Sequence, residues 1–250
     1  MKADYHIHTQ YSCDSNLKAE SLVDKAISLN YDLIAITEHL DLLPQELARF
    51  GLPSFAQYSR HIDALRASHA SSPLRIVMGV EVGDFQRVKP QADTLLEQIK
   101  PELVLGAVHF LSDHSNVAVP LKKPLTPAQI TDYYTQNLEL VKTCDIHALA
   151  HLGVYKRYYT QVPDESHCEG LLKEIFQAMI ERQIALEINF SALRKPYLHL
   201  LPESPQIELY RSLGGDLFTI GSDTHLLEHF DLGYGQLPAW LFSGEVRFPL

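Results

Sequence analysis

The chain has 250 residues and carries 21 Lys and Arg against 31 Asp and Glu, which gives a formal net charge of −10. Its 46% hydrophobic and 21% charged residues are typical of a globular protein and exclude a disordered chain, a coiled coil and a collagen-like repeat. No apolar stretch approaches the roughly 18 residues that cross a bilayer, and the acidity argues against a protein built chiefly to bind nucleic-acid phosphates.

The cysteines and the first residues indicate a compartment. Cys13, Cys144 and Cys168 are widely spaced and form no Cys-x-x-Cys pair, which does not suit a disulfide framework or a thiolate zinc site. The N-terminus has no apolar signal-peptide core, so the sequence predicts a cytoplasmic protein. Because we see no linker, charge block or internal repeat, we expect residues 1–250 to form a single domain.

Apolar, β-branched runs recur along the chain with helical segments between them. The expected strands are Ala3–His8, Leu33–Thr37, Ile76–Val82, Leu103–His109, Ile146–His151, Ala185–Asn189 and Leu217–Ser222. Thr126 followed by Pro127 and Gln129 predicts a helix that starts with a capping box, and Ser166 and Ser204 predict two more helix starts. Strands that alternate with helices predict an α/β fold with a parallel sheet, either doubly wound or closed as a barrel.

Polar side chains that can bind metal follow the C-terminal ends of these strands. They are His6, His8, His39, Glu81, His109, His151, Asp223 and His225, with Asn189 closing the sixth strand. The strand ends of a barrel converge on one mouth, whereas a doubly wound sheet spreads them along a line. The placement therefore favours a barrel with a site at its mouth.

His6 and His8 form a His-x-His pair, and residues two apart on a strand project to the same face. Asp4 precedes them in the same register, residues 223–225 supply an Asp-x-His pair, and Glu81 lies between two valines. A buried carboxylate needs a partner, and a metal ion is one. We therefore favour a polynuclear metal site over a pair of polar residues on an exposed edge.

Together these segments resemble the PHP (polymerase and histidinol phosphatase) superfamily, and within it the histidinol-phosphatase branch. The matching segments run in family order from residue 4 to residue 225: His6-x-His8, Ser12–Ser15, Thr37–His39, Gly79–Gly83, Val108–Phe110, Ala150–Gly153 and Gly221–His225. The resemblance covers nearly the whole chain. It implies a distorted (β/α)7 barrel, which agrees with the seven strands expected from the apolar runs.

The resemblance also implies a ligand set for three divalent ions of zinc, iron or manganese. The first ion would be bound by His6, His8, Glu81 and Asp223. Glu81 would bridge to a second, completed by His109 and His151, and the third would be bound by Asp14, His39 and His225. Position 14 is His in many members and Asp in others, so Asp14 leaves the occupancy of the third site open. Mixed His and carboxylate ligands suit all three metals.

Such a centre can activate water near neutral pH and neutralise a phosphoryl group, which makes phosphate-ester hydrolysis the leading chemistry. Arg157 and Arg194 match phosphate-binding arginines of the histidinol-phosphatase branch, and the alternative is a pair of solvated loop arginines. His114, in the loop after the fourth strand, is a further candidate for substrate contact. Phe110, Tyr155 and Tyr158 are candidates for the rest of the pocket.

The expected reaction converts L-histidinol phosphate, a small phosphorylated substrate, to L-histidinol and phosphate in histidine biosynthesis. Asp223 would act as general base and then help to protonate the leaving alkoxide. A PHP exonuclease that acts on nucleic-acid ends is an alternative, but the net charge of −10 argues against it. A protein-tyrosine phosphatase and a non-enzymatic metal-binding module are the others, and the module would require a defective ligand set.

Two smaller expectations concern segments outside the ligand set. His147 precedes His151 by four residues, so it is expected one layer deeper, either behind the site or in the core. Residues 233–250 are short for a final covering helix, which predicts an irregular tail.

Overall fold

The computed structural model describes residues 1–244 and 246–250. Its strands form one parallel seven-stranded sheet in chain order: β1 (Ala3–Ile7), β2 (Leu33–Asp41), β3 (Arg75–Gly83), β4 (Leu103–Ala107), β5 (Ala148–Leu149), β6 (Ala185–Asn189) and β7 (Phe218–Gly221). The helices are α1 (Ala19–Ser28), α2 (Pro44–Phe50), α3 (Phe55–Ser68), α4 (Phe85–Ile99), α5 (Pro127–Thr143), α6 (Glu169–Arg182) and α7 (Ser204–Ser212). The 3₁₀ turns are η1 (Val154–Tyr158), η2 (Ser166–Cys168), η3 (Ser191–Arg194), η4 (Leu227–His229), η5 (Tyr234–Gln236) and η6 (Ala239–Phe242).

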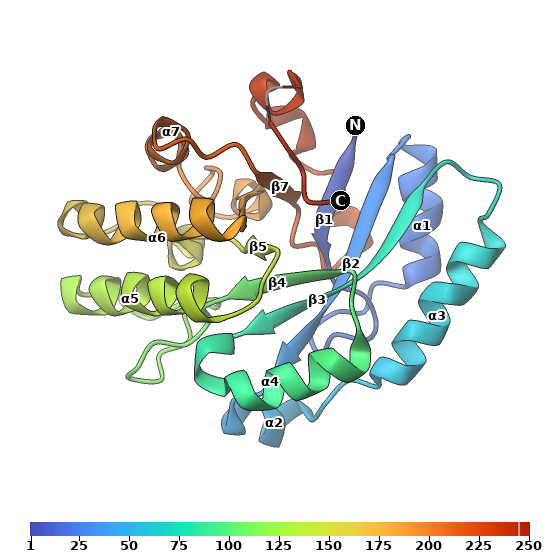
Figure 1. The fold of residues 1–250 in the computed structure, drawn as a ribbon, viewed down its shortest axis with the longest axis horizontal. Helices are drawn as coiled ribbons and strands as arrows, with labels where there is room; N and C mark the ends of the chain where they lie inside the picture. The colour runs from blue at the N-terminus through green and yellow to red at the C-terminus, as the bar shows by residue number, and fades with distance from the viewer. Residues whose placement is uncertain (245) are drawn as a thin grey trace.

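The sheet curls until the end of β7 meets β1. The backbone N–H of Asp223 donates to the carbonyl of His6, and that of His8 donates to the carbonyl of Thr224, both at 2.8 Å. Figure 1 shows α1 and α3 on one side of the strands and α5 and α6 on the other, with α4 between the two groups. The predicted distorted (β/α)7 barrel is confirmed.

The strand boundaries differ by one or two residues from the sequence prediction at β1, β3, β4 and β7, and by more at β2 and β5. β2 continues through His39 to Asp41 because β3 offers it a partner along its whole length. β5 is reduced to two residues, and a positive φ of 28° at His151 turns the chain out of the sheet. His147 precedes β5 and is exposed, so the prediction of a deeper layer behind His151 is wrong. Its Nδ1 accepts the backbone N–H of Val104 instead.

Of the predicted helix starts, one has the expected cap. Thr126 caps α5 with a complete capping box that includes Gln129. Ser166 does not cap an α-helix, because Asp164 accepts its N–H and hydroxyl and the chain forms a 3₁₀ turn first. Before α7 the capping residue is Glu203 rather than Ser204, which is already helical.

Alanine and aliphatic side chains, with one tyrosine, fill the part of the barrel away from the site. They are Ala3, Tyr5, Leu33, Ala35, Val77, Leu103, Leu105, Ala107, Ala148, Ala150, Ala185 and Leu217. The tail is irregular, as predicted, with two 3₁₀ turns, while its Glu245 lies outside the described residues. Phe248 stacks on Tyr5 with ring centroids 6.0 Å apart, so the tail covers this end of the barrel and brings the two chain ends together (Figure 1). Within the described ranges, no helix has the length and apolar character needed to cross a membrane.

Candidate metal centre

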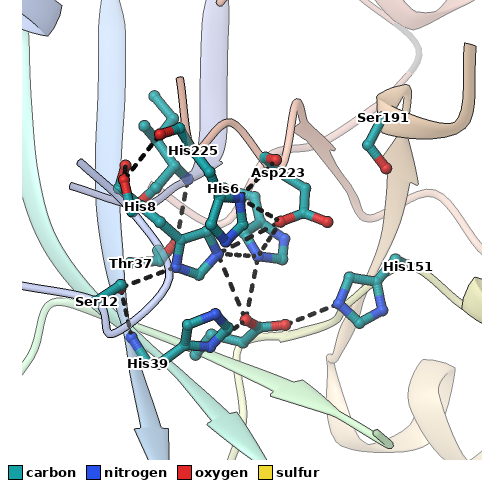
Figure 2. A network of polar contacts seen from close by, with 12 residues as sticks. His6, His8, Ser12, Thr37, His39, His151, Ser191, Asp223 and His225 are labelled. Atoms are coloured by element: carbon teal, nitrogen blue, oxygen red, sulfur yellow. Dashed lines mark hydrogen bonds and ion pairs between the residues drawn. The ribbon is translucent and has the colours of Figure 1, made fainter. Parts of the chain in front are cut away.

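Two histidines at the end of β1 face a carboxylate from β3. The Nε2 atoms of His6 and His8 lie 3.0 Å apart, and they lie 3.4 and 3.5 Å from Oε2 of Glu81. All three side chains are buried. Figure 2 shows His6, His8, His39, His151 and Asp223 converging on one point from different strand ends, as the strand-end argument predicts.

Glu81 connects this pair to histidines from the neighbouring strands. Its Oε1 lies within hydrogen-bond distance of Nε2 of His151, at 2.8 Å, and 3.5 Å from Nε2 of His109. Its Oε2 lies 3.1 Å from Nδ1 of His39. Three groups of potential ligand atoms, each within 4.8 Å of one another, result: His6, His8 and Glu81; Glu81, His109 and His151; and His8, His39 and His225. The first two groups lie within the sets predicted for the first and second ions.

Asp14 lies beside the third group. Its Oδ1 is 3.5 Å from Nε2 of His39, and its Oδ2 is 3.3 Å from Nε2 of His225. The structure thus brings together the three residues predicted for the third ion and adds His8 to them. Asp4, by contrast, belongs to none of the groups found in the described chain.

Asp223 lies between the histidines and an arginine. Its Oδ1 is 3.5 Å from Nε2 of His8 and 3.9 Å from Nε2 of His6. Its Oδ2 accepts a hydrogen bond from Nη2 of Arg157 at 2.5 Å. One carboxylate is therefore within reach of both the predicted metal position and a predicted phosphate contact.

The two central carboxylates are held in their charged form. Burial raises the pKa of Glu81, but the neighbouring His6, with hydrogen bonds from His109 and His151, outweighs burial and holds it well below its usual range. Burial likewise raises the pKa of Asp223, and the adjacent Arg157 outweighs that effect. Both groups are therefore anionic, as metal ligands must be.

The donor set fits divalent cations. His6 donates from Nδ1 to Glu187 at 2.7 Å, which leaves its Nε2, opposite Nε2 of His8, as the ring atom that can bind a metal. Two facing ring nitrogens and a buried carboxylate are costly to bury together unless they share a cation. Imidazole and carboxylate ligands suit zinc, iron(II) and manganese.

Glu187 on β6 contacts two residues of the centre, and the sequence analysis did not predict it. It is fully buried, and its second oxygen accepts the backbone N–H of His151 at 2.5 Å and the side-chain amide of Asn189 at 3.0 Å. Carboxylates that accept from the far side of a metal-binding imidazole orient the ring. The sequence did offer one signal: Glu187 and Asn189 are two residues apart near the end of a predicted strand, so their side chains lie on the same face.

A second missed carboxylate, Glu38, orders the loop after β1. The hydroxyls of Thr9 and Ser12 donate to it, and burial raises its pKa. Oγ of Ser12 also lies 3.2 Å from Nδ1 of His8 and accepts the backbone N–H of His39 at 3.1 Å (Figure 2). Glu38 thus acts through Ser12 on two of the histidines.

The centre opens into a cavity of about 460 Å³. Four of the residues predicted to contact substrate line it: Arg157, Arg194, Phe110 and Tyr158. His114 is exposed and is not among the residues that line this cavity, so the structure does not bring it to the centre. Tyr155 is buried elsewhere, where it donates to Glu165.

The two arginines come from 3₁₀ turns at neighbouring strand ends, Arg157 from η1 and Arg194 from η3. Nη2 of Arg194 donates to the carbonyl of Ser222 at 2.8 Å, while its Nε and Nη1, like Nε of Arg157, have no hydrogen-bond partner among the residues described. Those three nitrogens are buried, but both arginines line the cavity, and guanidinium groups that line a cavity can bind an anion. Lys195 lines the cavity next to them and adds a third cation that the sequence reasoning did not single out.

Comparison with known proteins agrees with this architecture. The PHP domain family matches residues 4–191. The chain is 26% identical to a protein named probable histidinol-phosphatase from Clostridium acetobutylicum over 94% of this chain and 90% of that one. It is 28% identical to histidinol-phosphatase from Lactococcus lactis subsp. lactis over 90% of this chain and 84% of that one.

A solved structure has the same fold. It is the crystal structure of histidinol phosphate phosphatase from Lactococcus lactis subsp. lactis complexed with zinc, L-histidinol and phosphate. The TM-score is 0.85 at 23% identity, and the match covers 99% of this chain and 95% of that chain. Since the family match includes most of the chain and every residue of the three His and Glu groups except His225, the chain belongs to the PHP domain family and is a phosphoesterase of that family.

Proposed function

We propose that this protein is a metal-dependent phosphomonoesterase that hydrolyses L-histidinol phosphate to L-histidinol and phosphate. The observation that carries the proposal is the shared cavity, in which Arg157 and Arg194 lie beside the carboxylates of Glu81 and Asp223. The relatives named histidinol-phosphatase and the L-histidinol and phosphate bound in the Lactococcus lactis structure support the choice of substrate.

Three divalent ions would be held by the residues of the centre: His6, His8, Glu81 and Asp223; Glu81, His109 and His151; and Asp14, His39 and His225. When bound, such ions activate water and neutralise the charge of a phosphoryl group. The zinc of the Lactococcus lactis complex supports zinc, while the donor set also accepts iron and manganese.

Arg157 and Arg194 would hold the phosphate. Both side chains line the cavity and would give charge-assisted hydrogen bonds to the non-bridging oxygens, where negative charge collects during phosphoryl transfer. Because the two side chains come from different turns, they would contact the phosphate from two directions and orient the ester for attack.

Asp223 would transfer the proton of the attacking water to the leaving group. Its carboxylate is anionic and can accept a proton from the attacking water as the new P–O bond forms. As the P–O bond to histidinol breaks, the same carboxyl can return that proton to the leaving alkoxide. Arg157 donates a hydrogen bond to Oδ2 of Asp223 and would thereby hold this carboxyl group next to the bound phosphate.

The experiment compares substrates on protein of measured metal content. We expect kcat/KM for histidinol phosphate to exceed that for a nucleoside monophosphate and for a phosphotyrosine peptide by several orders of magnitude. A labelled oligonucleotide, which the net charge of −10 should repel, tests the exonuclease alternative. Equal or higher kcat/KM for any of the other substrates would refute the assignment.

A further inference from the structure

A buried lysine directly precedes Arg157. Lys156 is 1% exposed although it carries an ammonium group. Its Nζ donates to Oε1 of Glu165 at 2.5 Å and to Oε2 of Glu203 at 2.7 Å. Its two partners are 18% and 32% exposed, but the ammonium group itself is buried, so a movement of η1 that separated it from both carboxylates would leave its charge uncompensated.

Glu165 is itself fixed by helices. The hydroxyl of Tyr134 on α5 donates to its Oε2 at 2.7 Å, and the amide of Gln206 on α7 donates to its Oε1 at 2.7 Å. Glu203 caps α7. The two carboxylates that bind Lys156 are thus attached to the outer helices, and we call Lys156, Glu165 and Glu203 the lysine clamp.

Arg157 points away from this clamp. Neighbouring side chains on a 3₁₀ turn diverge by about 120°, since the turn has about three residues. While Lys156 is enclosed by the protein, Arg157 lines the cavity and reaches Asp223. Anchoring the turn at Lys156 therefore fixes where the Arg157 side chain leaves the backbone, on the cavity side of η1.

We propose that Lys156 is a positioning residue for Arg157. By anchoring η1 to Glu165 and Glu203, it directs the guanidinium of Arg157 into the cavity before phosphate binds. The inference rests on the proposed function, because Lys156 acts only through the phosphate contact of Arg157. A preorganised arginine avoids the cost of ordering its side chain on binding, so loss of the clamp should appear as weaker phosphate affinity.

The test measures the affinity of the metal-loaded enzyme for inorganic phosphate by calorimetry. Lys156→Met should raise the Kd about fivefold to tenfold. Once Arg157→Ala has removed the guanidinium, adding Lys156→Met should cause no further loss. The matched control is Lys142→Met, because Lys142 is an exposed lysine with its Nζ 3.4 Å from Glu174, and its removal should leave the Kd unchanged.

The outcomes separate the two proposals. Normal phosphate affinity in Lys156→Met, beside weak affinity in Arg157→Ala, would contradict the positioning role alone. If Lys156→Met raised the Kd by the same factor in the wild type and in Arg157→Ala, the positioning role would also be contradicted, because a merely structural lysine would act independently of Arg157. Normal affinity in Arg157→Ala would overturn the phosphate role of that arginine, and the inference with it.

A second variant covers the case in which Lys156→Met does not fold. Glu203→Gln keeps Lys156 paired with Glu165 and leaves an amide oxygen to cap α7. It should raise the phosphate Kd about twofold to threefold, and again only when Arg157 is present. An unchanged Kd in folded Glu203→Gln would contradict the contribution of this half of the clamp.

Discussion

Glu187 accepts a hydrogen bond from Nδ1 of His6 at 2.7 Å, and neither side chain is exposed. The contact leaves Nε2 of His6, 3.4 Å from Oε2 of Glu81, as the ring atom that can bind a metal. The other oxygen of Glu187 accepts the backbone N–H of His151. One carboxylate thus orients a residue from each of the two ligand groups that share Glu81.

Glu187→Gln should weaken metal binding. The amide replaces one acceptor oxygen with an NH₂ group, which must then face an N–H donor. We expect the metal affinity to fall about 10- to 100-fold, measured by competition with a chromophoric chelator. Thr219→Val is the control, because Thr219 is the buried sheet partner of Glu187 and its hydroxyl has no hydrogen-bond partner among the described residues. Unchanged affinity in Glu187→Gln would show that this contact does not orient His6.

Asp223→Asn should reduce turnover more than binding. The substitution keeps the volume but removes the negative charge that accepts the proton, and we expect kcat to fall about 10²- to 10⁴-fold. Elemental analysis must accompany the kinetics, since Asp223 is also a predicted ligand. A variant with full metal content and near-normal kcat would exclude Asp223 as the base.

The convergence of the predicted ligands could be foreseen because it follows from strand geometry. His6 and His8 are two residues apart at the end of β1, and Glu81 lies near the end of β3, two strands away in the sheet. The convergence of parallel strand ends brings such residues together whatever the details of the loops.

The supporting contacts could not be predicted, because they join residues far apart in the chain. His6 and Glu187 are separated by 181 positions, and the Glu-x-Asn spacing alone does not show which side chain Glu187 contacts. The register shift between Asp4 and Ile7 and the early end of β5 also depend on neighbouring strands rather than on local pattern. The prediction for His147 was wrong for the same reason, because it assumed that the strand reached from His147 to His151.

Arg194→Ala should weaken binding of the phosphate ester. Loss of charge-assisted hydrogen bonds worth roughly 1.5–3 kcal/mol corresponds to an increase in KM of about 10- to 100-fold. Arg194→Lys should recover only part of the loss, because an ammonium group cannot reproduce the planar two-nitrogen contact. Arg60→Ala, at an exposed position of α3, is the control. Full recovery by lysine would indicate that charge alone matters.

Glu203→Gln should cost stability in a pH-dependent way. Burial raises the pKa of Glu203, but the hydrogen bond from Lys156 outweighs burial and holds the pKa below its ordinary value of 4.5, with Tyr197 and His199 as the other titratable neighbours. A carboxyl group whose pKa is lower in the folded state stabilises the protein above its unfolded pKa, and this stabilisation disappears as the pH falls through the folded pKa.

The difference in free energy of unfolding between the wild type and Glu203→Gln should therefore be constant from pH 7 to about pH 5.5 and shrink below about pH 4.5. Urea unfolding at several pH values measures it. Glu174→Gln, which removes an exposed partner of Lys142, should give a small difference at every pH. If the Glu203→Gln difference grew as the pH fell, Glu203 would have a raised pKa in the folded protein, and Lys156 would not be its dominant partner.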